Sequence, residues 1–152
     1  MSSNHTWVYR LWKWVNKLPQ GLEHLELGNS FNKTIDNLPC GLKTLSLGKT
    51  FNKPVDKLPS GLETLQLYSI HFNNSIKKLP NNLVNFIFYG QIKNLTDIPN
   101  SVSYLEIGNK QLTIKDIIPK NIKKIHYMSN IDNELINKYP DIQFVYCPTS
   151  FV

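Results

Sequence analysis

The side chains that most often do chemistry in proteins are thinly scattered along this chain. Four histidines stand far apart, and none has a carboxylate or a cysteine nearby at the spacing of metal ligands. They are His5, His24, His71 and His126. Cys40 and Cys147 are 107 residues apart, which fits neither a metal site nor a disulfide framework. We therefore predict no metal site and two reduced thiols.

Motifs of catalysis are absent from the sequence. It contains no glycine loop for phosphate, no H-E-x-x-H, no C-x-x-C and no serine in a nucleophile elbow. We predict that the protein is not an enzyme, with no catalytic residue and no cofactor. An enzyme whose site is assembled from distant parts of the chain stays open as an alternative, because sequence spacing does not show which distant residues meet.

Lysine is the one charged residue that recurs regularly. The position six residues before successive prolines holds Lys13, Lys33, Lys53, Asn74, Lys93 and Thr113. If these positions stack, the four lysines form a basic ridge that suits an acidic protein, a phosphoinositide or nucleic acid. The net charge is +6, but Arg10 is the single arginine, which argues against specific nucleic-acid recognition. The simpler interpretation is a column of solvated surface lysines.

The lysines recur because the chain repeats itself. LPQGLEHLELGNSFNKTID from Leu18 is followed by LPCGLKTLSLGKTFNKPVD from Leu38, and a third copy begins at Leu58. Prolines mark the period at Pro19, Pro39, Pro59, Pro80, Pro99, Pro119 and Pro140. Repetition at a period of about 20 to 50 residues indicates a solenoid.

Each repeat carries the pattern of one short strand. Apolar residues stand three, six and eight positions after the proline, as at Leu22, Leu25 and Leu27. The alternation predicts a strand with one buried face, and proline, which cannot donate to a ladder, predicts the corner before it. A repeat of 20 residues leaves no room for a long crossover helix. We expect an irregular or 3₁₀ return segment and a right-handed coil with one parallel sheet.

A second marker lies in the return segment. Phenylalanine and asparagine recur as the pairs Phe31-Asn32, Phe51-Asn52 and Phe72-Asn73. We expect the rings to stack along the wall opposite the strands. We expect the asparagines to turn inward and bond backbone groups of the neighbouring coil, because an unpaired buried backbone group is costly.

The string LPxGLxxLxLGxxFNxPIxxLP resembles the FNIP repeat, a short relative of the leucine-rich repeat found in social amoebae and amoeba-infecting giant viruses. Residues 21–55 match it closely, and the resemblance extends over about residues 11–127. After Gln91 the Phe-Asn pair is lost. The resemblance implies a mainly β, leucine-rich-repeat-like solenoid of about seven turns with little helix. Family members often carry an F-box, but the first turn starts near His5, so a role in ubiquitin ligases is not carried over.

We predict one domain over residues 1–152. Residues 1–19 form a degenerate capping half-repeat, residues 20–129 the repeats, and residues 130–152 a C-terminal cap. Tryptophans are expected to cover the open N-terminal end, with ligand binding as the alternative: Trp7, Trp12 and Trp14. In the cap we expect a helical turn over 134–138 and a last strand over 142–146, one residue out of register with Pro140. The sequence shows no signal peptide and no membrane span, so we expect an intracellular, cytoplasmic protein.

The predicted function is a non-catalytic scaffold that binds an unidentified protein with its concave sheet. Outward positions of the middle turns hold an aromatic and aliphatic patch rimmed by Gln66, Glu106 and His126. The patch comprises Tyr68, Asn85, Ile87, Tyr89 and Tyr104. Two alternatives stay open: return loops or the C-terminal cap fold over this patch, or the lysine ridge Lys13, Lys33, Lys53 and Lys93 binds an acidic partner.

Overall fold

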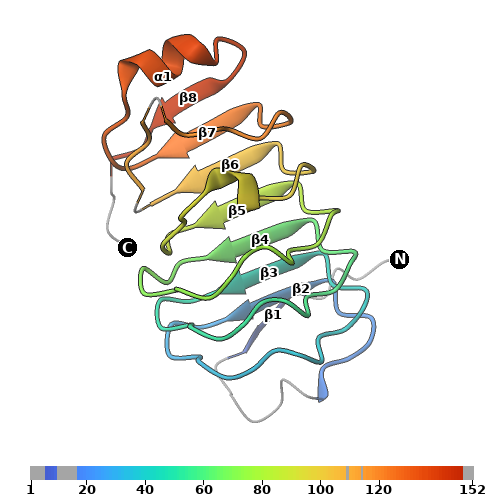
Figure 1. Cartoon of the computed structure of the whole chain (residues 1–152). Coiled ribbons are helices and arrows are strands. Elements are labelled where there is room, and N and C mark those ends of the chain that lie inside the picture. The colour runs from blue at the N-terminus through green and yellow to red at the C-terminus, as the bar shows by residue number, and fades with distance from the viewer. Residues whose placement is uncertain (1–5, 10–16, 109, 114, 149–152) are drawn as a thin grey trace.

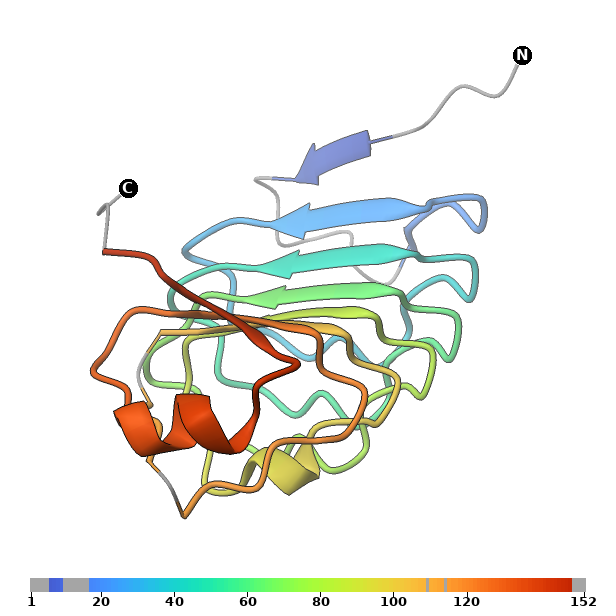
Figure 2. The ribbon, with the colours of Figure 1, turned by 90° about the horizontal axis from the view of Figure 1, so that it is seen from above.

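The computed structural model describes residues 6–9, 17–108, 110–113 and 115–148. The chain winds into a coil in which each turn contributes one short strand and one return segment (Figure 1). Viewed from above, the chain runs counterclockwise as it advances toward the viewer, so the coil is right-handed (Figure 2). The predicted mainly β solenoid is therefore confirmed.

The strands in the described residues form one parallel sheet of eight, in the order of the sequence. Neighbours pair in register, so that Leu25, Leu45 and Leu65 stand side by side. The strands are β1 (Thr6–Tyr9), β2 (His24–Leu27), β3 (Thr44–Leu47), β4 (Thr64–Leu67), β5 (Asn85–Phe88), β6 (Tyr104–Ile107), β7 (Lys124–Tyr127) and β8 (Gln143–Tyr146).

The proline corners from Pro19 to Pro119 end their return segments in the same way. The carbonyl of the corner proline accepts a hydrogen bond from the N–H three residues on, at 3.1 Å for Pro19 and 3.2 Å for Pro39. The same bond forms at Pro59, Pro80, Pro99 and Pro119. Proline suits this corner because it has no N–H to donate and favours an extended conformation for the residue before it. The repeated turn sets where each strand starts.

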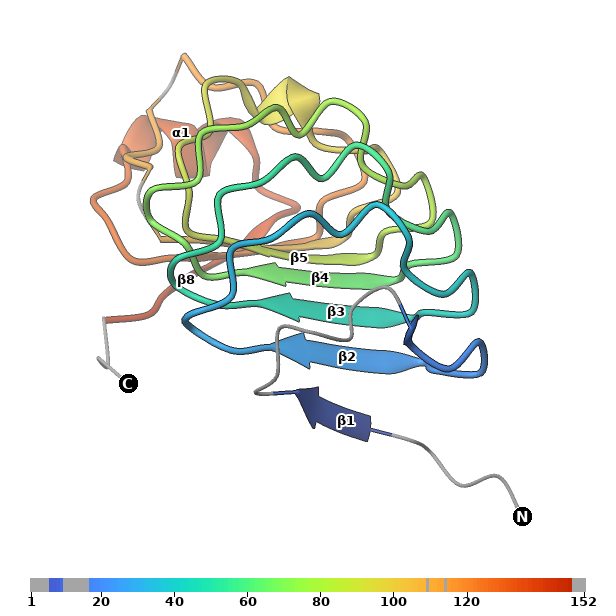
Figure 3. The ribbon, with the colours of Figure 1, turned by 90° about the horizontal axis from the view of Figure 1, so that it is seen from below.

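The core lies between the sheet and the return segments (Figures 2 and 3). The predicted inward residues are buried: Leu22, Leu25 and Leu27 are 1%, 2% and 2% exposed. On the opposite wall Phe31 and Phe51 stack at 6.2 Å between ring centroids, and Phe51 and Phe72 at 6.3 Å. The predicted phenylalanine ladder is confirmed for these three turns.

The ladder ends at Phe72. Its ring next meets Phe88 of β5 edge to face at 5.8 Å. Gly90 makes this contact possible, because a Cβ there would come within 2.7 Å of the Phe88 ring and 2.9 Å of Phe72 Cβ. The return wall then continues with smaller apolar groups, among them Leu95 of the 3₁₀ helix η2 (Leu95–Asp97).

The asparagines of the Phe-Asn pairs link consecutive turns. Asn32 Oδ1 accepts from the Asn52 N–H at 2.9 Å, and Asn52 Oδ1 accepts from the Asn73 N–H at 3.3 Å. The predicted bond to the backbone of the neighbouring coil is thus confirmed. The predicted inward orientation is wrong, because Asn32 and Asn73 are exposed and Asn52 is half-buried. Each side chain bonds along the edge of the coil and does not enter the core.

The C-terminal residues close the stack with helix α1 (Asn133–Lys138) and β8. Asp132 begins the helix by accepting a hydrogen bond from the Glu134 N–H, and Leu135 is fully buried. Phe144 pairs with Ile125 but stands four residues after Pro140, whereas Leu25 stands six after Pro19. Relative to its proline, β8 therefore begins two residues earlier than the other strands do. We predicted an offset of one residue, and this prediction was wrong.

Two changes at the last corner, of one residue each, cause this offset: the turn begins one residue earlier, and β8 starts one residue sooner after its turn than β7 does. The turn bond of this corner runs from the Ile142 N–H to the carbonyl of Tyr139, which precedes the proline.

At the N-terminus, β1 adds a strand to what the sequence indicated as a half-repeat. The side chains of Trp7, Trp12 and Trp14 lie outside what the structure describes. No helix in the described part of the chain is long and apolar enough to cross a membrane.

Candidate functional site

The face of the sheet that points away from the core carries three columns of side chains, because successive strand residues alternate in direction. We call it the outer face. The pairing register aligns its middle column as Glu26, Ser46, Gln66, Ile87, Glu106, His126 and Val145. Ile87 is an apolar residue in a column that is polar from Glu26 to Gln66 and polar again at Glu106 and His126.

Two tyrosines stand directly after β4 and β5. The Tyr68 and Tyr89 N–H groups donate to the carbonyls of Leu47 and Leu67, both at 3.0 Å, and so extend the strand ladder by one residue. Their rings meet edge to face at 5.4 Å. The Tyr89 ring lies over Gly108, where a Cβ would come within 2.8 Å of its Cγ. Glycine in the next turn therefore makes room for this ring.

Glu106 joins two neighbouring turns of the outer face. Tyr89 Oη donates to its Oε1 at 2.7 Å, and Tyr104 Oη lies 3.0 Å from its Oε2. The carboxylate side chain is only 15% exposed. Hydrogen bonds to an ionised acceptor are stronger than those between neutral groups, which compensates for the partial loss of water. Glu106 thus holds both tyrosine rings in place.

Burial is the main reason why the pKa values of Tyr89 and Tyr104 lie well above the ordinary tyrosine range. Their hydrogen bonds to Glu106 and its negative charge raise these pKa values further. Burial likewise raises the pKa of Tyr68, with Glu106 and Glu26 adding to the effect. All three phenols keep their protons at neutral pH and act as donors or neutral rings.

His126 extends the cluster toward the C-terminal edge of the sheet. Its ring packs against Tyr104 at 5.1 Å, and its Nδ1 lies 3.0 Å from Tyr104 Oη and 3.8 Å from Glu106 Oε2. Cys147, the residue after β8, places its Sγ 3.4 Å from the same Nδ1. The Nε2 atom is buried with no hydrogen-bond partner among the described residues.

The structure gathers the residues predicted for the binding patch on neighbouring strands, and each is half-buried. Asn85 lies to one side, in the first column, where its Nδ2 donates to Thr64 Oγ1 at 3.2 Å. We use the name outer-face cluster for the other predicted residues together with two neighbours that contact them, Glu106 and Cys147. The cluster consists of Tyr68, Ile87, Tyr89, Tyr104, Glu106, His126 and Cys147.

Two members of the cluster were misjudged or missed in the sequence. Glu106 was expected at the rim and is instead the central acceptor. Cys147 was not assigned to the patch, because its place depends on the two-residue offset of β8. The signal that finds it is the alignment of Phe144 with Ile125, which carries Cys147 next to His126.

In the described residues, neither the return loops nor the C-terminal cap folds over this cluster. Helix α1 packs on the side of the return segments, away from the outer face (Figures 2 and 3). Strand β8 extends the sheet instead of folding across it (Figure 1).

The lysine ridge runs along the return wall. Lys33 and Lys93 are exposed and Lys53 is half-buried, while Lys13 lies outside the described residues. The same wall also carries acidic side chains in ion pairs with other lysines. These pairs are Lys57–Asp36 at 3.2 Å, Lys78–Asp56 at 3.9 Å and Lys77–Asp97 at 4.0 Å. The wall therefore alternates in sign and is not uniformly basic.

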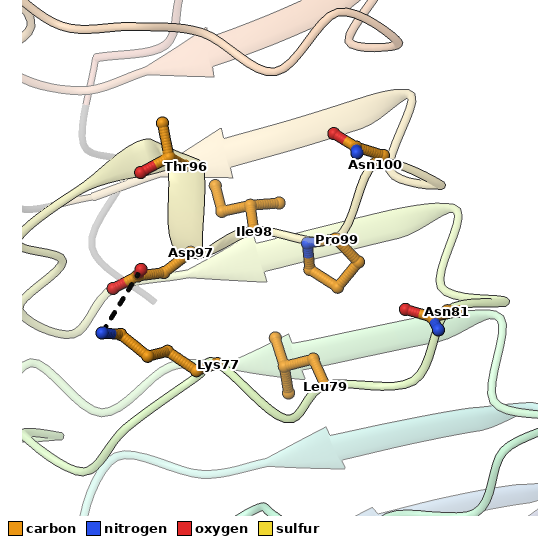
Figure 4. Close-up of a pocket in the computed structure, with 8 residues that line it drawn as sticks. All are labelled: Lys77, Leu79, Asn81, Thr96, Asp97, Ile98, Pro99 and Asn100. Atoms are coloured by element: carbon orange, nitrogen blue, oxygen red, sulfur yellow. Dashed lines mark ion pairs between the residues drawn. The ribbon is translucent and has the colours of Figure 1, made fainter.

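One depression of about 280 Å³ opens between two return segments next to η2 (Figure 4). The Lys77–Asp97 ion pair lies in its lining, where Leu79 and Ile98 are the buried apolar residues (Figure 4). Its other lining residues are Asn81, Thr96, Pro99 and Asn100. These side chains form no nucleophile–base pair. Among the described residues no group of His, Cys, Asp or Glu is arranged to hold a metal ion.

Comparison with known proteins agrees with the repeat pattern. The family model of the FNIP repeat matches residues 15–49 and 34–69. Residues 15–69 of this chain therefore carry FNIP repeats. Its fold is similar to the crystal structure of CroV588, a novel circular LRR (leucine-rich repeat) protein, with a TM-score of 0.62 and 34% sequence identity. The similarity covers 76% of this chain and 19% of the CroV588 chain, so the present chain spans about a fifth of that protein. No curated protein sequence matches it.

Proposed function

We propose that this FNIP-repeat solenoid is a protein-binding scaffold and that the outer-face cluster is its contact surface. The observation that carries this proposal is the group of half-buried aromatic and aliphatic side chains on three adjacent strands of a mostly polar sheet face. Interfaces are enriched in tyrosine at their centres, because a tyrosine offers a large rigid surface at a low entropic cost.

The internal hydrogen bonds of the cluster support this role. Tyr89 and Tyr104 direct their hydroxyl groups to Glu106, so the rings are held before any partner arrives. A surface that is already ordered loses less conformational entropy on binding. The contact surface therefore consists of fixed ring faces around Ile87.

A matched pair of substitutions tests the proposal. Ile87→Lys places a cation beside Glu106 on the outer face, whereas Val84→Lys changes an exposed apolar residue just before β5. Both variants are expected to fold, which the melting temperature checks. In affinity capture with quantitative mass spectrometry, a true partner is retained by the wild type and by Val84→Lys and lost with Ile87→Lys. Equal retention by folded Ile87→Lys contradicts the proposal.

The lysine ridge remains a second candidate surface, supported by the exposure of Lys33 and Lys93 and the net charge of +6. An electrostatic complex weakens steeply as salt rises, because screening and counterion release dominate its affinity. A salt titration of the captured complex separates the two surfaces. Affinity that is nearly constant with salt favours the outer-face cluster.

A further inference from the structure

Cys147 lies at the C-terminal edge of the outer-face cluster and is positioned by the sheet. Its N–H donates to the Tyr127 carbonyl at 2.9 Å, so the backbone at this residue continues the β7–β8 ladder. The side chain is half-buried, and its Sγ lies 3.4 Å from His126 Nδ1. That distance is within reach of a hydrogen bond to sulfur.

The polar groups around His126 converge on the nitrogen that faces the thiol. Tyr104 Oη lies 3.0 Å from Nδ1, and Glu106 Oε2 lies 3.8 Å from it. In the arrangement where Tyr104 donates its proton to Glu106 Oε2 at 3.0 Å, the Nδ1 lone pair is open to the proton of Cys147. Nε2 is buried without a partner among the described residues, so the contacts on the Nδ1 side orient the ring.

Cys147 and His126 have the arrangement of a nucleophile beside its base. Tyr104 holds the imidazole in place through the ring contact at 5.1 Å. Here the thiol belongs to the residue after β8, the imidazole to β7 and the carboxylate to β6. The titratable groups that face His126 are Glu106 and Tyr104 from β6 and Cys147 beyond β8. The carboxylate stabilises positive charge on the imidazole when it takes a proton.

We propose that Cys147 is a nucleophilic thiol, with His126 as its base, and that it forms a mixed disulfide with small-molecule disulfides. His126 Nδ1 takes the thiol proton as Sγ attacks one sulfur of the reagent. The reagent's S–S bond breaks, a new S–S bond to Cys147 forms, and the departing thiolate leaves and takes up a proton. One disulfide is consumed and one is formed, so no separate oxidant is needed.

The chain carries its own reference in Cys40, which is exposed and follows the corner proline Pro39. If solvent exposure alone determined the rate, Cys40 would react faster than the half-buried Cys147. A higher rate at Cys147 therefore reports activation and not exposure.

Single-cysteine variants make the comparison direct, because the sequence has only two cysteines. Cys40→Ser leaves Cys147 alone, and Cys147→Ser leaves Cys40 alone. Each is mixed with 4,4′-dithiodipyridine, and the released thiopyridone is followed by its absorbance. At pH 7 we expect Cys147 to react at least about 10-fold faster than Cys40. Replacing His126 by Asn in the Cys40→Ser protein should remove this advantage, while His24→Asn at the other end of the outer face should not.

The pH dependence keeps the proposal testable even if His126→Asn unfolds the chain. The reaction rate of an unassisted thiol falls about tenfold for each pH unit below the thiol pKa, because only the thiolate attacks. The Cys147 rate should fall less steeply than the Cys40 rate between about pH 8 and pH 6, since the imidazole assists. Equal slopes, a slower Cys147 at every pH, or an unchanged rate in folded His126→Asn would each overturn the proposal.

Discussion

Glu106 and Tyr89 stand on different turns, and the register of the sheet makes them neighbours. The sequence places Glu106 among polar residues at the edge of a patch, which is where a solvated carboxylate is expected. In the structure it accepts two phenolic hydrogen bonds and is mostly buried. Its role therefore depends on the packing of two turns and is not visible from its own flanking residues.

At the residue scale this arrangement predicts a loss of stability at high pH. The pKa of Tyr89 is raised in the folded chain, so the folded state holds the phenol proton more tightly than the unfolded state. Its contribution is fully present below the ordinary tyrosine pKa of about 10 and is lost as pH rises through the folded value. Tyr89→Phe removes this group and should flatten the fall in unfolding free energy above about pH 10 in urea titrations.

The matched control is Tyr146→Phe, which removes an exposed phenol at the edge of the sheet. It should leave the alkaline slope as it is in the wild type. If both variants change the slope equally, the interaction between Tyr89 and Glu106 does not account for the alkaline loss.

At the scale of elements, the phenylalanine ladder predicts which side chain of the return wall matters most. Phe51 is fully buried and stacks on Phe31 and Phe72 from both sides. Phe51→Ala leaves a cavity between two rings and should lower the unfolding free energy by about 3 to 5 kcal/mol. Urea denaturation measures this. Cys40→Ser, at an exposed position one residue past a corner, should change it by less than about 0.5 kcal/mol. A larger loss in Cys40→Ser would contradict the register.

The sequence alone was sufficient for the elements built by the repeat. The strands β2 to β7 lie where the spacing from each proline puts them, because the same proline turn precedes each one. It was not sufficient for β8, since the last turn begins one residue earlier, at Tyr139, and β8 follows that turn one residue sooner, which together shift the strand by two residues. The position of Cys147 depends on that shift. Because of this local change, the repeat spacing does not predict that Cys147 lies at the site.

At the scale of the whole molecule, the stack has ends that need covering. Leu135 of α1 is fully buried and packs in the same core as the repeats. Leu135→Ala should therefore cost about 2 to 5 kcal/mol, as much as a residue from the middle of the coil. Replacing Glu134 by Ala, exposed on the same helix, is the control. If the melting temperatures of both variants equal that of the wild type, the helix does not stabilise the stack.

The order of the strands in the sheet also governs how fast the chain can fold. Each strand pairs with the next one along the chain, so every ladder bond closes a loop of about one repeat, from 18 to 21 residues between paired positions such as Thr6 and His24 or Thr64 and Asn85. Loop closure entropy grows slowly with length, so no step in assembly requires a much larger closure than any other. Folding can start at any adjacent pair of turns and spread in both directions. The most regular turns, β2 to β4 with the stacked phenylalanines, are where that first pair forms most readily.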